Sequence, residues 1–127
     1  MFDVSQEDEN PINPIFGQSA LRYLKNKTTG QIKMDEPDAE DWGWYSYAEW
    51  ENQKYLIGTS AEQEDASNGT WCFQIEKQRS IKERLLGKEK MTKDDGCLQV
   101  ILSILKADSQ ITSIELECPL LAESGHN

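Results

Sequence analysis

The residue types that most often carry out catalysis are sparse in this sequence. The one histidine, His126, stands next to the last residue, and chain ends are rarely held in a fixed position. A catalytic side chain must be held in a preorganised geometry. We therefore predict neither a Ser/His/Asp nor a Cys/His mechanism, and we expect a non-enzymatic protein with no catalytic residue.

The cysteines do not form a recognisable site. Cys72, Cys97 and Cys118 lie far apart, and no Cys-x-x-Cys pair or Cys/His cluster occurs. Structural zinc sites need such clusters, whereas small secreted domains usually carry even and dense sets of cysteines. Cys72 and Cys97 fall in predicted elements, where a free cysteine is commonly a small core residue. We predict no metal site, reduced thiols and a cytoplasmic protein.

Carboxylates are the most abundant candidates for chemistry, and they gather at 36–41 and at 62–65. Neither stretch has the glycine-turned register of a calcium loop. Glycoside hydrolysis needs two opposed carboxylates, which abundance alone does not supply. No glycine-rich phosphate loop is present. We predict no cofactor and interpret both stretches as solvated acidic loops.

The net charge points to a class of partner. The chain has 23 acidic and 13 basic residues, a net charge of −10, which disfavours nucleic acid and anionic membranes and favours a basic protein. Residues 42–50 are rich in Trp and Tyr, residue types that form either the core on one face of a sheet or an interface hot spot. We predict a non-enzymatic acidic protein-binding module, comparable in character to inhibitors or immunity-type proteins that occlude a basic partner. The predicted partner-binding residues are Glu36, Asp38, Glu40, Asp41, Glu49 and Glu51.

Two alternatives stay open. The first is a small-ligand-binding protein or enzyme that uses acidic and aromatic residues around a pocket. The second is nucleic-acid or nucleotide binding through 77–93, which holds seven basic and two acidic residues. That segment contains no aromatic residue to stack a base. The sequence requires no particular oligomeric state, although an exposed strand edge would permit a dimer.

The element pattern predicts an α+β fold. A helix is expected from Asn13-Pro14 to about residue 27, followed by a short strand at 31–35 and an acidic loop at 36–41. Alternation over 42–50 and 54–61 predicts a β-hairpin, and 70–77 predicts a third strand. Two helices are expected from Ser80 and Thr92, and a last strand at 110–116.

These elements give an antiparallel sheet of about four to five strands, with an N-terminal helix and two later helices packed on one face. The expected boundaries are a flexible acidic arm at 1–11, a single domain at 12–119 and a flexible tail at 120–127. Residues 1–9 lack the apolar core of a signal peptide, and no apolar run approaches the ~18 residues of a membrane span.

Overall fold

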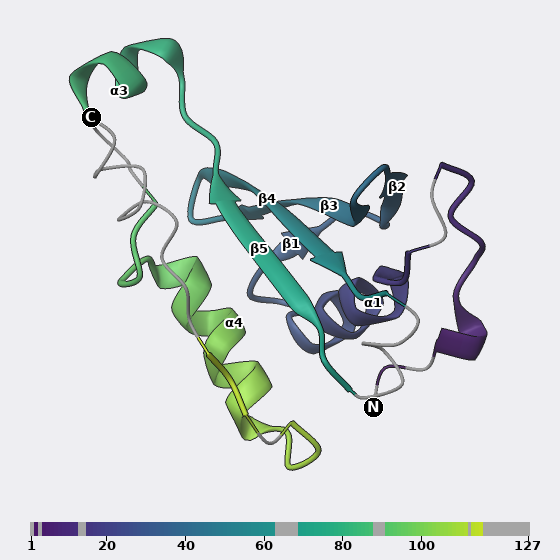
Figure 1. The fold of residues 1–127 in the computed structure, drawn as a ribbon. Helices are drawn as coiled ribbons and strands as arrows, with labels where there is room; N and C mark the ends of the chain where they lie inside the picture. The colour runs from purple at the N-terminus through teal and green to yellow at the C-terminus, as the bar shows by residue number, and fades with distance from the viewer. Residues whose placement is uncertain are drawn as a thin grey trace. The chain divides into compact units, whose positions relative to one another are not determined.

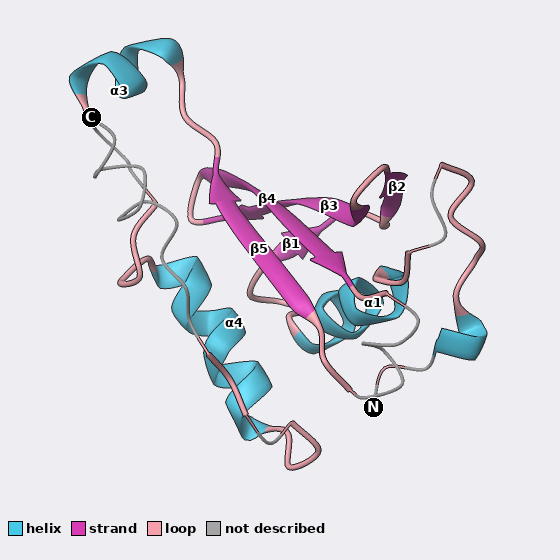
Figure 2. Cartoon of the chain, viewed as in Figure 1, coloured by secondary structure: helices cyan, strands magenta, loops and turns pink. Residues whose placement is uncertain are grey.

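A computed structural model describes residues 2, 4–12, 15–62, 69–87, 91–111 and 113–115 of the chain. Its described residues form two compact units, Phe2–Gln78 and the residues from Arg79 onward. The first unit holds the sheet and one α-helix, and the second holds two further helices (Figures 1 and 2). The prediction of one domain over 12–119 stays a prediction.

The first unit is built around an antiparallel sheet in the order β1-β3-β4-β5, with β2 also paired to β3. Its strands are β1 (Lys33–Met34), β2 (Asp38–Glu40), β3 (Gly43–Trp50), β4 (Gln53–Ser60) and β5 (Cys72–Lys77). The sheet is preceded by a short 3-10 helix, η1 (Val4–Gln6), and by α1 (Gln18–Lys27).

The hairpin of β3 and β4 is the centre of the sheet, and its prediction is confirmed. Trp50 pairs with Gln53, which leaves a two-residue turn of Glu51 and Asn52. Both turn residues have positive φ, 46° and 65°, as a type I′ turn requires. That turn matches the right-handed twist of the strands and so sets the register of the whole hairpin.

Alternation along β3 separates a buried face from an outer face. Trp44, Ser46 and Ala48 are buried, and this face packs against α1, which contacts both β3 and β4. From α1, the side chains of Leu21 and Leu24 are fully buried. The core of this unit therefore lies between α1 and one face of the sheet (Figure 1).

In the second unit, α3 (Ile81–Leu86) begins with the predicted capping box. Ser80 accepts a hydrogen bond from the Glu83 backbone N–H, while the Glu83 carboxylate accepts one from the Ser80 N–H. Gly87 ends the helix in the left-handed conformation, as expected for a C-terminal glycine. Among the described residues, no helix is long and apolar enough to cross a membrane.

Both longer helices begin later than predicted. Asn13 and Pro14 lie outside the described residues, and α1 begins at Gln18 because the Phe16 backbone instead pairs with Ala61. The second helix of the later unit, α4 (Gly96–Ala107), is capped by Asp95 rather than Thr92.

The Asp95 carboxylate is the stronger cap because it accepts hydrogen bonds from the backbone N–H groups of Cys97 and Leu98, at 3.0 and 3.2 Å. A side chain that satisfies two of the free N–H groups at a helix start stabilises that start.

Two further corrections concern strands. The acidic stretch 36–41 was predicted to be a loop, but its central residues form β2 because they pair with β3. The predicted strand at 110–116 is wrong for the described residues 110, 111 and 113–115, which lie in no strand. The α+β class is confirmed, because the described residues form an antiparallel sheet and three α-helices.

Candidate functional site

The outer face of the sheet carries two neighbouring tyrosines. Tyr45 and Tyr47 alternate with the buried residues of β3, so both side chains project from the face opposite α1. Their rings meet edge to face with centroids 5.6 Å apart, a favourable aromatic geometry. Tyr47 is 48% exposed, which leaves an aromatic surface open to a partner.

Two carboxylates border these tyrosines. Asp38 is the cross-strand partner of Tyr45, and Glu40 pairs with Gly43, so both acids share the outer face. Asp38 accepts a hydrogen bond from the backbone N–H of Ala39, and Glu40 accepts one from that of Asp41. Neither Asp38 nor Glu40 forms an ion pair with any described residue.

The ionisation of Tyr45 reflects this setting. Desolvation of the phenol, followed by the negative charge of Asp38, raises the pKa of Tyr45 above its ordinary value. Smaller contributions in the same direction come from Tyr47 and Glu40. Near neutral pH the site therefore holds a neutral phenol that can donate a hydrogen bond, beside acids that can accept one.

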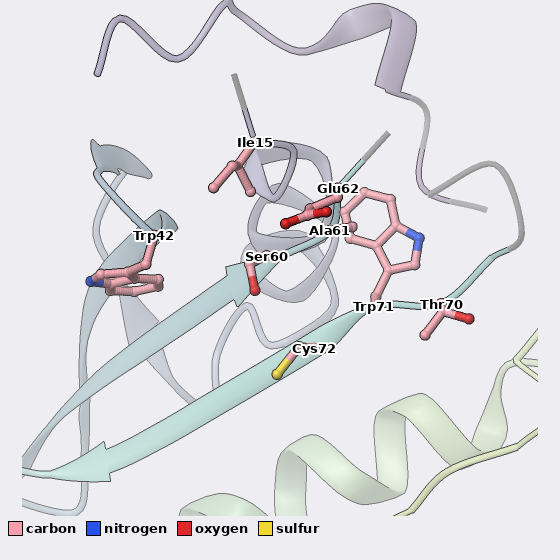
Figure 3. A pocket seen from close by; sticks show the side chains of 8 residues that line it. All are labelled: Ile15, Trp42, Ser60, Ala61, Glu62, Thr70, Trp71 and Cys72. Atoms are coloured by element: carbon pink, nitrogen blue, oxygen red, sulfur yellow. The ribbon is translucent and has the colours of Figure 1, made fainter. Parts of the chain in front are cut away.

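A pocket of about 230 Å³ lies where β4 ends and β5 begins. Trp42 and Trp71 stand on opposite sides of it (Figure 3). Its lining consists of Ile15, Trp42, Ser60, Ala61, Glu62, Thr70, Trp71 and Cys72. Among the described residues that line the pocket, Glu62 alone is acidic, and it is exposed.

Trp42 is held in place by a glycine and by a polar anchor. A Cβ on Gly58 would lie only 2.4 Å from Cη2 of Trp42, so the indole packs directly on the β4 backbone. The side chain of Asn10 donates hydrogen bonds to the carbonyl oxygens of Glu40 and Gly43, at 3.1 and 2.9 Å. These bonds fix both sides of the turn that presents Trp42.

The other walls of the pocket are also fixed. Phe2 meets the Trp71 ring edge to face at 5.0 Å. The buried Trp44 donates its indole N–H to the carbonyl oxygen of Ile15 at 2.9 Å, and the backbone of Phe16 pairs with that of Ala61. Three contacts from distant parts of the sequence therefore hold this end of the sheet together.

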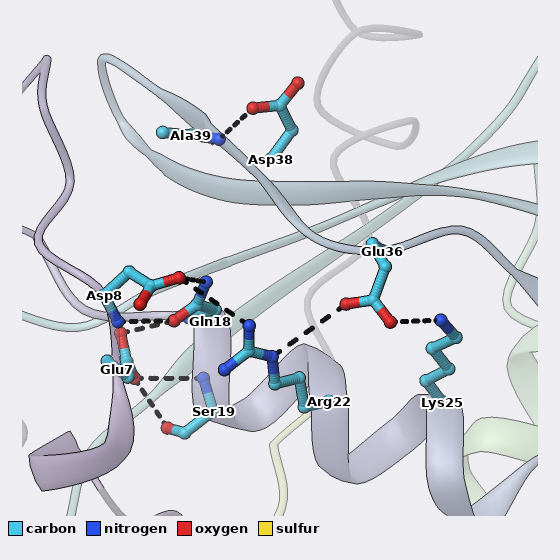
Figure 4. A network of polar contacts seen from close by, with 9 residues as sticks. All are labelled: Glu7, Asp8, Gln18, Ser19, Arg22, Lys25, Glu36, Asp38 and Ala39. Carbon is cyan, nitrogen blue, oxygen red and sulfur yellow. Dashed lines mark hydrogen bonds and ion pairs between the residues drawn. The ribbon is translucent and has the colours of Figure 1, made fainter.

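Residues near the N-terminus bind the start of α1 (Figure 4). The Glu7 carboxylate accepts hydrogen bonds from the backbone N–H groups of Gly17, Gln18 and Ser19, and one from the Ser19 hydroxyl. Gly17 has no side chain to cap the helix, so Glu7 supplies the cap from ten residues away in sequence. The flexibility of the arm at 1–11 stays a prediction. The hydrogen bonds between Glu7 and the start of α1 would restrict such motion.

Glu36, one of the predicted partner-binding residues, is already paired. Its carboxylate accepts a hydrogen bond from Lys25 and lies 4.0 Å from Nε of Arg22. The hydrogen bond from Lys25 and the positive charge of Lys25 lower the pKa of Glu36. Two cations of α1 therefore offset the Glu36 charge that a basic partner would need (Figure 4).

The structure divides the six predicted residues instead of joining them. Asp38, Glu40 and Asp41 lie at the β2 end of β3, whereas Glu49 and Glu51 lie at the hairpin turn. At about 3.3 Å per residue, these two ends of β3 are roughly 20 Å apart.

The acids at the hairpin turn are also less suited to bind a cation. Glu49 pairs in register with Lys33 on one side and Lys54 on the other, so cations of the same sheet flank it.

The sequence did not predict the pocket between Trp42 and Trp71. Gly58 within a strand was a signal for it, since a strand glycine often marks a close approach of another group to the backbone.

The other sequence candidates fall elsewhere. Cys97 is buried and Cys72 is exposed, and neither forms a disulfide with a described residue. Cys118, His126 and 88–90 lie outside the described residues. Within the described part of the chain, no group of three His, Cys, Asp or Glu side chains could hold a metal ion.

The basic segment 77–93 includes α3, which exposes three apolar side chains, Ile81, Leu85 and Leu86.

Comparison with models of known families, with curated proteins and with solved structures gives no match.

Proposed function

We propose that this chain is a non-enzymatic, cytoplasmic protein-binding module that occludes a basic surface of a partner protein, as an inhibitor or immunity-type protein does. The observation that supports the proposal is the Tyr45–Tyr47 pair, of which Tyr47 is exposed, bordered by Asp38 and Glu40, which form no ion pair with a described residue. Aromatic side chains surrounded by polar groups are the usual composition of interface hot spots.

Charge distribution supports the same surface. Residues 2–78 hold 15 acidic and six basic residues, so the first unit carries nine of the ten net negative charges. A field of one sign steers a partner of opposite charge and raises the association rate. We therefore assign binding to the β2 end of the outer face, which is defined by Asp38, Glu40, Asp41, Tyr45 and Tyr47.

The experiment is a matched capture with the full chain. We compare the wild-type protein with two double variants, Asp38→Asn/Glu40→Gln and Glu49→Gln/Glu51→Gln. Each double variant removes two negative charges. Each of the three proteins is used to capture proteins from a native lysate at low salt. We expect a basic protein that the first variant loses and the second retains. The association rate of the purified pair should fall severalfold between low and physiological salt.

Three results would count against the proposal. Equal loss of the captured protein with both double variants would mean that binding depends on the net charge of the chain and not on the β2 end of the outer face. A captured nucleic acid would favour the basic segment 77–93. An association rate that does not change with salt concentration would contradict electrostatic steering of a basic partner by this acidic surface.

A further inference from the structure

The Trp42–Trp71 pocket joins two aromatic walls to one carboxylate. Trp42 is 38% exposed and Trp71 is partly buried, so each leaves indole surface available at the pocket. Glu62 and Cys72 are exposed at its margin. Glu62 forms no ion pair with any described residue, which leaves its charge available to a ligand.

The size of the pocket restricts what it can hold. Its volume, about 230 Å³, is below the roughly 300–1,000 Å³ of pockets that hold drug-sized ligands. It is better matched to one long side chain than to a substrate with several functional groups. The described residues of the lining include one carboxylate, that of Glu62, whereas the glycosidase type of hydrolysis needs two.

The side chains that line the pocket favour a positively charged ligand. Indole faces attract positive charge through the ring quadrupole, and the Glu62 carboxylate adds an opposite charge that can accept hydrogen bonds. A guanidinium group suits this lining better than an ammonium group. It is planar, stacks on aromatic faces, is more weakly hydrated and can donate two parallel hydrogen bonds to a carboxylate.

We propose that the Trp42–Trp71 pocket receives an arginine side chain of a basic partner protein. This inference rests on the proposed function, because it names the chemical group by which that partner is anchored. The pocket adjoins the β2 end of the outer face through the turn that carries Trp42, since Asp41 and Trp42 link β2 to β3. A single arginine could therefore enter the pocket while neighbouring cations meet Asp38 and Glu40.

The pocket is built before any ligand arrives. Trp42 rests against Gly58, its turn is tied to Asn10, and Trp71 is held by Phe2. A preorganised aromatic site loses little side-chain entropy when it binds, which increases affinity. A weak interaction with one isolated side chain should therefore be measurable.

The test uses N-acetyl-arginine amide as a probe and N-acetyl-citrulline amide, its uncharged counterpart, as the matched control. The four tryptophans give separate indole N–H signals in a ¹⁵N-resolved NMR spectrum. We expect the arginine probe to shift the Trp42 and Trp71 signals at millimolar concentration, with Trp50 as an internal reference at the hairpin end of β3. The citrulline probe should bind at least about threefold more weakly.

Three variants locate the interaction. Glu62→Gln keeps the shape of the side chain and should weaken arginine binding about threefold, and Trp42→Leu should weaken it by at least as much. Glu76→Gln is the control, because Glu76 is an exposed acid of β5 outside the pocket lining. Equal binding of both probes, equal effects of Glu62→Gln and Glu76→Gln, or no shift at Trp42 and Trp71 would overturn the proposal.

The two proposals can fail separately. If a basic protein is captured through Asp38 and Glu40 while the arginine probe shifts neither indole, the pocket proposal is wrong and the proposed function stands. If the probe binds at the pocket but no basic protein is captured, the assignment of a cation pocket stands and the proposed function is wrong.

Discussion

At the scale of single residues, Tyr45 reports on the charge of the proposed binding face. Its phenol is partly desolvated and stands opposite the Asp38 carboxylate, and both effects raise its pKa. Removing the charge of Asp38 removes one of these effects and leaves the desolvation. The ionisation of one tyrosine can therefore measure the field at this surface without any partner.

We predict that Asp38→Asn lowers the pKa of Tyr45 toward its ordinary value near 10, while Glu49→Gln leaves it unchanged. The measurement is an alkaline titration of the tyrosine ring signals by NMR, with Tyr45→Phe to assign the signal. An unchanged Tyr45 pKa in Asp38→Asn would show that the charge of Asp38 does not contribute to the shift.

The same shift has a defined effect on stability. A phenol whose pKa is higher in the folded state favours folding while it is protonated, so this contribution is complete below the unfolded pKa. It is lost as the pH rises from about 10 through the folded pKa of Tyr45. The free energy of unfolding should fall less steeply with alkaline pH in Tyr45→Phe than in the wild type.

At the scale of elements, the start of α1 depends on a residue outside the helix. The Glu7 carboxylate accepts hydrogen bonds from three successive backbone N–H groups at the start of α1, with distances of 3.1 to 3.2 Å. These groups have no partner within the helix, and a negative charge near them also interacts favourably with the helix dipole.

We predict that Glu7→Ala lowers the free energy of unfolding by about 1–2 kcal/mol and speeds amide exchange at Gly17, Gln18 and Ser19. Denaturant unfolding and hydrogen exchange measure the two effects. Glu9→Ala is the control, because Glu9 is an exposed acid without a hydrogen bond or ion pair among the described residues. Equal effects of Glu7→Ala and Glu9→Ala would contradict the capping role.

Local signals predicted those elements that local interactions determine. The hairpin followed from the alternation of Trp44, Ser46 and Ala48, because strand side chains point to opposite faces in turn. The start of α3 followed from Ser80 and Glu83, which cap each other. Each of these patterns is complete within a few neighbouring residues, so the sequence alone displays it.

Long-range pairing determined what the sequence did not predict. Phe16 is kept out of α1 by backbone hydrogen bonds to Ala61, and β2 exists only because it pairs with β3. The pocket likewise joins Trp42 and Trp71 through the register of β4 and β5. No spacing rule along the chain relates residues that only the sheet brings together.

At the scale of the whole molecule, the two units differ sharply in charge. Residues 2–78 carry nine of the ten net negative charges, and the residues from Arg79 onward carry seven basic and eight acidic residues. A charge change confined to α3 therefore tests whether the basic segment 77–93 takes part in binding. Lys82 and Arg84 are both exposed on that helix.

We predict that Lys82→Glu combined with Arg84→Glu leaves capture of a basic partner intact or strengthens it. The substitutions remove positive charges that repel such a partner and add negative ones that attract it. The measurement is the same capture from lysate, with a circular dichroism spectrum to show that helix content is kept. If the basic segment binds nucleic acid, the double variant should instead lose a ligand that the wild type retains, because phosphate contacts depend on these charges. Loss of the captured ligand in a folded double variant would therefore move the binding surface from the acidic sheet to α3.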